Sequence, residues 1–218
     1  TTSYYDGTAH ASMDGYIDEL RISNFARYGN IDIPTTQLNT WQILGRGQNT
    51  LLPHHTKLLI QANSSTTTSS AIVDESGNHA ITIADGAAYS QGKTNFGNTA
   101  IYFDGSNDEL QVADSDDWHF GTGDFSVEFW ANDTGGSTAH GYIGQWVSGN
   151  KGWGIWYNDA SSGKIQFVYS TDGTGQTTID YGATSIVSDN LWHHFVACRN
   201  NGVFAGYIDG QLVTGTTL

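Results

Sequence analysis

The chain has 218 residues, 38% of them hydrophobic and 12% aromatic, and its 22 acidic against 8 basic residues give a formal charge of −14. This size and composition suffice for a sizeable buried core, which excludes a disordered linker. The charge repels phosphates, which excludes nucleic acid and anionic lipid surfaces as partners, while it suits divalent cations and solubility.

The predicted elements are all strands. Twenty-seven glycines, two prolines and frequent Ser, Thr, Asn and Asp residues indicate many tight turns, and no stretch has a helical period. In Phe125-Ser-Val-Glu-Phe, the alternation places Phe125, Val127 and Phe129 on one face. The pattern predicts an all-β, two-sheet antiparallel jelly-roll sandwich. In chain order, the expected strands are 15–23, 57–63, 79–84, 99–104, 109–113, 124–131, 142–147, 152–158, 163–170, 192–199 and 202–209.

The segment between the first and second expected strands breaks the pattern. Pro34, the Gly45-Arg-Gly turn and Pro53 interrupt any ladder, so residues 35–56 are predicted to connect two units. The single cysteine, Cys198, lies in an apolar run and is predicted to be a buried small hydrophobe. No run approaches the ~20 apolar residues that a membrane helix needs, so we expect no membrane insertion.

Several motifs, weak one by one, agree in order with one family. The chain resembles laminin-G-like, concanavalin-A-like lectin modules of the kind found in repetitive phage and extracellular structural proteins. The resemblance implies a jelly-roll sandwich that binds glycans or acts as a spacer, outside the cell or on a virion surface, for example in an adhesin or a tail fibre. The motifs are Gly15-Tyr-Ile-Asp-Glu-Leu-Arg-Ile-Ser-Asn, Asp74-Glu-Ser-Gly-Asn-His, Tyr102-Phe-Asp-Gly-Ser, Phe120-Gly-Thr-Gly-Asp-Phe-Ser-Val-Glu-Phe-Trp, Trp192-His-His and Tyr207-Ile-Asp-Gly.

The order of these motifs departs from the family, because the motif of the closing strand comes first. We therefore expect residues 1–34 to hold the closing strand of a preceding module or a neighbouring copy, and 57–218 to be a sandwich lacking its final strand. This favours a segment of a tandem array over a circular permutation. A third possibility is that a neighbouring copy fills the open edge by strand addition. Other copies or modules of the same protein are thus expected partners.

The sequence lacks the residue pairs that glycan cleavage needs. Glycosidases use two carboxylates at a set separation, often at alternating positions of one strand. Glu128 has no carboxylate two or four residues away, and Asp18 and Glu19 are adjacent, so they are expected on opposite faces of a strand. No Gly-x-Ser-x-Gly nucleophile turn occurs. We predict no catalytic residues and no enzyme activity.

Calcium is the one cofactor that the sequence suggests. Acidic turns offer hard oxygen ligands, and the candidate ligands are Asp104, Asn107, Asp108 and Asp114. The two acidic runs, Asp104-Gly-Ser-Asn-Asp108 and Asp114-Ser-Asp-Asp117, do not match the spaced Asp-x-Asp-x-Asp-Gly loop, so solvated turns are the favoured alternative. The adjacent pair His193-His194 faces opposite ways in a strand and does not suit zinc.

Aromatic residues gather on two neighbouring expected strands. Sugar recognition uses rings that stack on a pyranose together with a few polar partners. The predicted carbohydrate-binding residues are Trp146, Trp153, Trp156, Tyr157 and Asn150. Trp153 and Trp156 lie on opposite faces of their strand, so one of them is expected to be exposed. Core or interface packing is the alternative for each ring, with Trp130 and Trp192 filling the centre of the sandwich.

Two functions are left open by the sequence. The first is a non-enzymatic, lectin-like module that binds glycans or cell-surface polysaccharide and mediates adhesion. The second is a purely structural spacer or filament subunit that assembles head to tail.

Overall fold

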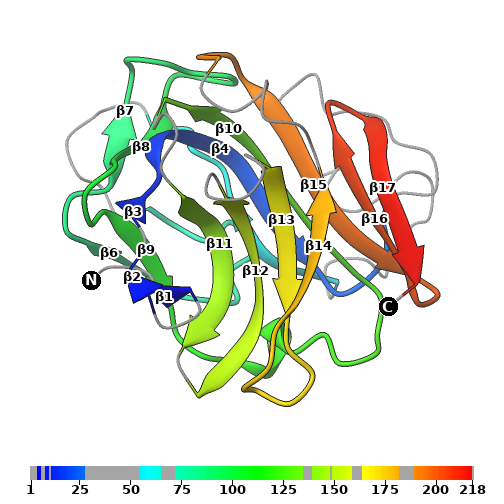
Figure 1. Ribbon diagram of the computed structural model, residues 1–218. Coiled ribbons are helices and arrows are strands. Elements are labelled where there is room, and N and C mark those ends of the chain that lie inside the picture. Colours follow the sequence, from blue (N-terminus) through cyan, green and yellow to red (C-terminus); the bar gives the residue numbers. More distant parts are fainter. Residues whose placement is uncertain are drawn as a thin grey trace.

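The computed structural model is a sandwich of two β-sheets (Figure 1). It describes residues 4–5, 8–9, 11–27, 55–64, 72–134, 139–147, 149–158, 164–181 and 189–217. The strands are β1 Tyr4–Tyr5, β2 Thr8–Ala9, β3 Ala11–Ser12, β4 Asp14–Ser23, β5 Thr56–Ile60, β6 Ile81–Ala84, β7 Ala88–Ser90, β8 Ala100–Asp104, β9 Glu109–Val112, β10 Phe125–Asp133, β11 His140–Val147, β12 Asn150–Asn158, β13 Lys164–Tyr169, β14 Thr177–Tyr181, β15 His193–Asn200, β16 Val203–Ile208 and β17 Gln211–Thr217. A single turn of 3₁₀ helix, η1, spans Asp116–Trp118.

The larger sheet has the order β17-β16-β15-β10-β4-β8-β7, with β5 also paired to β4, and the smaller sheet has the order β14-β13-β12-β11-β3. In Figure 1, β11 to β14 lie in front of β4, β10 and β15. Two small ribbons, β1-β2 and β6-β9, complete the described strands. The all-β sandwich predicted from the sequence is confirmed, and the strands that the sequence pattern did not reveal are β1 to β3, β7, β14 and β17.

The core lies between the two sheets. Phe125, Val127 and Phe129 of β10 are at most 2% exposed and belong to it, as their alternation predicted. Rings from the two sheets meet there, with the centroids of Phe125 and Phe167 5.5 Å apart. Trp130 lies outside this centre, contrary to the packing expected for it. It follows Phe129 in β10, so its side chain points to the opposite face, where it stacks on His194.

The N-terminal strand β4 occupies the middle of the larger sheet. It pairs with β10 along one side, and on its other side with β8 through residues 14–17 and with β5 through residues 20–23. The expectation that this strand completes a neighbouring module is therefore wrong for this structure, because the same chain fills the position. Of the predicted connection 35–56, residues 35–54 lie outside the described residues.

A β-bulge marks the point where β4 changes partner. Trp130 pairs with Asp18 and Glu128 with Arg21, so β4 carries one extra residue, and Glu19 has a φ of 50°. Asp18 is 1% exposed, and burial raises its pKa to about 7 against the hydrogen bond from the backbone N–H of Phe96. The simple alternation expected for Asp18 and Glu19 fails at this bulge.

A buried ion pair fastens β4 to β10. Arg21 and Glu128 are each 1% exposed and are joined by a hydrogen bond and a salt bridge. Burial acts to raise the pKa of Glu128, but the guanidinium of Arg21 and contacts with His194 and Arg27 hold it at about 2. Glu128 is thus a charged structural residue.

A second charged cluster forms where β15 begins. His193 contacts Asp209 through Nδ1 at 2.6 Å and Asp189 through Nε2 at 2.9 Å. The hydrogen bond with Asp209 is the main cause that raises the pKa of His193 from 6.5 to about 9, against the effect of burial. The carboxylates of Asp189 and Asp209 thus both contact the imidazolium of His193, and Asp209 connects the start of β15 to the β16–β17 turn.

This cluster makes stability depend on pH. Because the pKa of His193 is higher in the folded than in the unfolded chain, its stabilisation is complete below pH 6.5 and is lost as pH rises to about 9. We expect the wild-type free energy of unfolding to fall by about 2 kcal/mol over this window, after allowance for solvent screening. The measurement is urea unfolding at pH 6 and pH 9.5, where His193→Gln is expected to remove most of the change; an unchanged pH dependence in that variant would contradict the assignment.

Candidate functional site

A polar pocket lies at one end of the sandwich. The loop 113–124 between β9 and β10 forms most of it, and the start of β5 and the residue after β4 close it. It encloses about 200 Å³. Its lining residues are Asn24, Lys57, Asp116, Asp117, His119, Phe120, Gly123 and Asp124.

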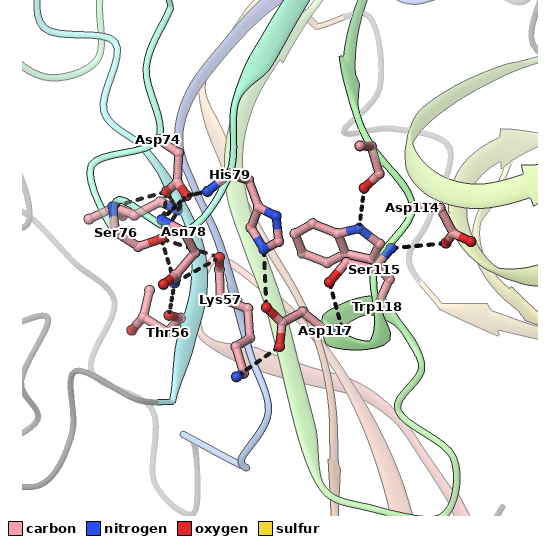
Figure 2. Close-up of polar contacts among 12 residues, drawn as sticks. Thr56, Lys57, Asp74, Ser76, Asn78, His79, Asp114, Ser115, Asp117 and Trp118 are labelled. Atoms are coloured by element: carbon pink, nitrogen blue, oxygen red, sulfur yellow. Dashed lines mark hydrogen bonds and ion pairs between the residues drawn. The ribbon is translucent and has the colours of Figure 1, made fainter.

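Asp117 joins the pocket loop to the opposite wall. It pairs with Nζ of Lys57 at 2.8 Å and with Nε2 of His79 at 3.1 Å (Figure 2). The hydrogen bond from Lys57 is the main cause that lowers the pKa of Asp117, so the carboxylate is ionised at neutral pH. His79 also packs on the ring of Trp118, with centroids 4.5 Å apart.

The turn that carries His79 is fixed by one buried carboxylate. Asp74 is 8% exposed and accepts hydrogen bonds from the backbone N–H groups of Leu59, Ser76, Asn78 and His79, at 2.9 to 3.1 Å. Figure 2 shows these bonds converging on its two oxygens. The motif Asp-Glu-Ser-Gly-Asn-His therefore has a structural role, since it attaches the turn to β5 and so holds His79 in place.

Hydrogen bonds of Trp118 and Trp153 attach the pocket loop to the core. Trp118 is 6% exposed and donates through Nε1 to the carbonyl of Ala113 at 3.1 Å, a bond drawn in Figure 2. The carbonyl of Trp118 accepts from Nε1 of Trp153 at 2.9 Å. The ring of Trp153 also lies 5.1 Å from that of Phe120. The core side of β12 therefore positions the loop.

Arg199 fixes the other half of the loop. This side chain is 9% exposed and donates to the carbonyls of Phe120, Gly121 and Gly123, with a bond of 2.7 Å from Nε to Gly123. Burial lowers the pKa of Arg199. Asp124, which follows these residues, accepts the backbone N–H of Asn201 at 2.8 Å. Contacts of Arg199 and Asp124 thus fix the shape of the pocket without a ligand.

The rim of the pocket carries exposed hydrogen-bonding groups. His119 has a half-exposed side chain, and its Nδ1 is 3.7 Å from the fully exposed carboxylate of Asp116. Gln145 of β11 donates to Asp114 at 2.7 Å and lies 3.1 Å from Nε2 of His119. Amide, imidazole and carboxylate groups beside the half-buried ring of Phe120 can together contact hydroxyls and an apolar face.

The aromatic residues predicted to bind sugar do not form an open platform. Trp153 and Tyr157 are each 5% exposed and belong to the core, while Trp146 and Trp156 pack with Val168 in a separate buried cluster. Trp156 lies across glycines, since a Cβ atom at Gly141 would come within 2.3 Å of its ring. Stacking on a sugar needs an accessible ring face, so the prediction of exposed rings is wrong. Asn150, at the start of β12, is exposed.

The predicted calcium ligands do not form one set. Asp108 accepts the backbone N–H of Asp104 through Oδ2, and its Oδ1 is packed against Gly86. Asn107 adjoins Asp108, but Asp114 lies at the opposite end of β9, where it contacts Gln145. Among the described residues, no group of three or more His, Cys, Asp or Glu side chains is arranged to hold a metal ion. The four residues therefore do not fit a single calcium site.

The sequence shows no local ligand-binding motif at several residues that line or support the pocket. Lys57 lines it, while His79 and Arg199 hold the loop in place from two other parts of the chain. The one local signal is the acidic run Asp114-Ser-Asp-Asp117, which predicts a calcium ligand rather than a pocket wall.

Comparisons with known proteins place the chain in a family. The search of curated proteins and the search of solved structures each return no match. The family model described as "Concanavalin A-like lectin/glucanases superfamily", a laminin G type, matches residues 103–218. Modules of this type are compatible with carbohydrate binding or adhesion, are generally non-enzymatic and are often extracellular. No helix in the described part of the chain is long and apolar enough to span a membrane. The chain belongs to the laminin-G-type family of the concanavalin A-like lectin/glucanase superfamily.

Proposed function

We propose that the protein is a non-enzymatic, glycan-binding adhesion module of an extracellular or virion-surface structural protein, and that the pocket at loop 113–124 is its binding site. The observation that carries this proposal is the pre-formed pocket. Arg199, Asp74 and Trp153 hold its walls, while His119, Asp116 and Asn24 remain open to solvent. A site that is rigid before binding loses little conformational entropy when the ligand arrives.

The pairing of two described carboxylates, Glu128 and Asp117, favours binding over cleavage. Glu128 is buried and paired with Arg21, which removes it from any role at the surface. In the pocket, Asp117 is engaged by Lys57 and His79, so its pKa is lowered and it does not suit the role of a proton donor. Glycosidases need one carboxyl group that stays protonated near neutral pH.

The first test is a glycan array, read with and without a calcium chelator, followed by titration of the glycans that bind. We expect binding in both conditions. His119→Ala is expected to weaken it about fivefold, the effect of losing one hydrogen bond, with no change in melting temperature. Gln91→Ala, an exposed change outside the pocket, is the control and should leave affinity unchanged. An array with no positive glycan would contradict the proposal.

The spacer function remains the second candidate, because one sheet edge carries exposed apolar residues. On β16 and β17, Val203, Leu212 and Val213 are 47%, 60% and 43% exposed. An edge strand with exposed apolar side chains can pair with another chain. If the array is negative and the protein forms oligomers in solution, the spacer function replaces glycan binding.

A further inference from the structure

The pocket carries more acidic than basic groups. Its lining includes three aspartates, Asp116, Asp117 and Asp124, and one lysine, Lys57. Lys57 and His79 both contact Asp117, so this carboxylate already has its countercharge. The charge of the pocket is therefore decided by Asp116 and Asp124.

These two carboxylates are open to a ligand. The Asp116 side chain is fully exposed, and the base beside it, His119, is 3.7 Å away and itself half exposed. Asp124 accepts a backbone N–H from Asn201, while the neighbouring Arg199 directs its hydrogen bonds to backbone carbonyls. The charge of the buried Arg199 acts on Asp124 and offsets part of its negative charge. The pocket keeps an acidic excess, most of it on Asp116, within a chain whose formal charge is −14.

We infer that the pocket takes a glycan with protonated amino groups, such as a glucosamine oligomer, and discriminates against glycans built from uronic acids. The inference rests on the proposed function and specifies its ligand class. A sugar ammonium group gains ion pairs and hydrogen bonds with Asp116 and Asp124. A uronate brings a like charge to the same place, which opposes binding. His119 and Asn24, which also line the pocket, supply partners for the sugar hydroxyls.

The test is calorimetric titration of the whole chain with three oligomers of equal length: glucosamine, N-acetylglucosamine and galacturonate. We expect the glucosamine oligomer to bind most tightly and the galacturonate oligomer least. Added salt should weaken binding of the glucosamine oligomer selectively, because its extra affinity comes from exposed charges.

The matched variant is Asp116→Asn/Asp124→Asn, which removes both charges and keeps oxygen acceptors at both positions. Its affinity for the glucosamine oligomer should fall about tenfold, while its affinity for the N-acetylated oligomer should change less than about twofold. Asp85→Asn is the control, because it removes an exposed carboxylate outside the pocket at a positive φ that Asn tolerates. This control should bind like the wild type.

The outcomes separate this inference from the proposed function. If the N-acetylated oligomer binds as tightly as the glucosamine oligomer, or if galacturonate binds more tightly, the glycan-binding function stands and the charge selectivity is wrong. An unchanged affinity in the double variant has the same meaning. If none of the three oligomers and no glycan on the array binds, both proposals fall.

Discussion

Replacing Arg21 with Met is expected to destabilise the protein by about 3 kcal/mol, because it leaves the carboxylate of Glu128 buried without its main countercharge. Arg21 and Glu128 are each 1% exposed, so water cannot compensate for the loss. His194 and Arg27 remain within 3.6 Å and 3.4 Å of Glu128 and keep the cost from rising further. The measurement is the free energy of unfolding from urea titration, with the wild-type slope retained.

The double variant Arg21→Met/Glu128→Gln is the control for this expectation. Removing the carboxylate charge as well should recover part of the loss, by about 1 kcal/mol or more, because the two residues are energetically coupled. Two results would show that the pair does not attach β4 to β10 as described. One is a cost of less than about 1 kcal/mol for Arg21→Met. The other is a double variant whose loss of stability equals the sum of the losses in Arg21→Met and Glu128→Gln measured singly.

Replacing Trp153 with Ala is expected to cost about 3 to 5 kcal/mol and to abolish glycan binding. The ring is 5% exposed in the core, and its Nε1 holds the carbonyl of Trp118 at 2.9 Å. The change therefore leaves a cavity below the loop 113–124 and releases the loop. Thermal unfolding and glycan titration of the same variant measure the two effects.

Trp153→Phe separates packing from the hydrogen bond. Phenylalanine keeps most of the apolar contact but lacks the N–H donor, so we expect a cost of about 1 kcal/mol. For each variant, the loss of glycan affinity is divided by the loss of stability. This ratio should be larger for Trp153→Phe than for Ile165→Val, a core change remote from the pocket. Equal ratios for the two variants would show that Trp153 affects binding only through global stability.

The sequence predicted the architecture because alternation and turn residues are local signals. The pattern of Phe125, Val127 and Phe129 gave the face of β10 that forms the core, and the structure confirms it. The position of β4 was not predictable in the same way. Its motif indicated a closing strand, but pairing with β10, β8 and β5 depends on contacts between distant residues, up to 118 positions apart for Gly15 and Asp133.

The candidate site was predicted poorly, because burial of aromatic rings depends on neighbours in space. Alternation placed Trp153 and Trp156 on opposite faces, as the structure has them, yet both are buried. Trp156 is covered in part because Gly141 and Gly154 let the ring lie flat on β11 and β12. Likewise, contacts of Arg199 with the carbonyls of residues 120–123 join positions 76 or more apart in sequence.

The bulge at Glu19 shows a further limit of pattern reading. A glutamate with a φ of 50° is uncommon, and no local feature of Ile-Asp-Glu-Leu indicates it. The irregularity lies where β4 exchanges β8 for β5 on one side, an arrangement that involves distant parts of the chain.

The most direct test of the proposed site is amide chemical-shift mapping by NMR, with the tightest-binding glycan from the array added to the labelled protein. The account predicts that the perturbed amides cluster in residues 113–124 and at Asn24 and Lys57, around the pocket. Perturbations confined to the β11–β12 and β13–β14 turns, or spread over the outer face of the larger sheet, would contradict it.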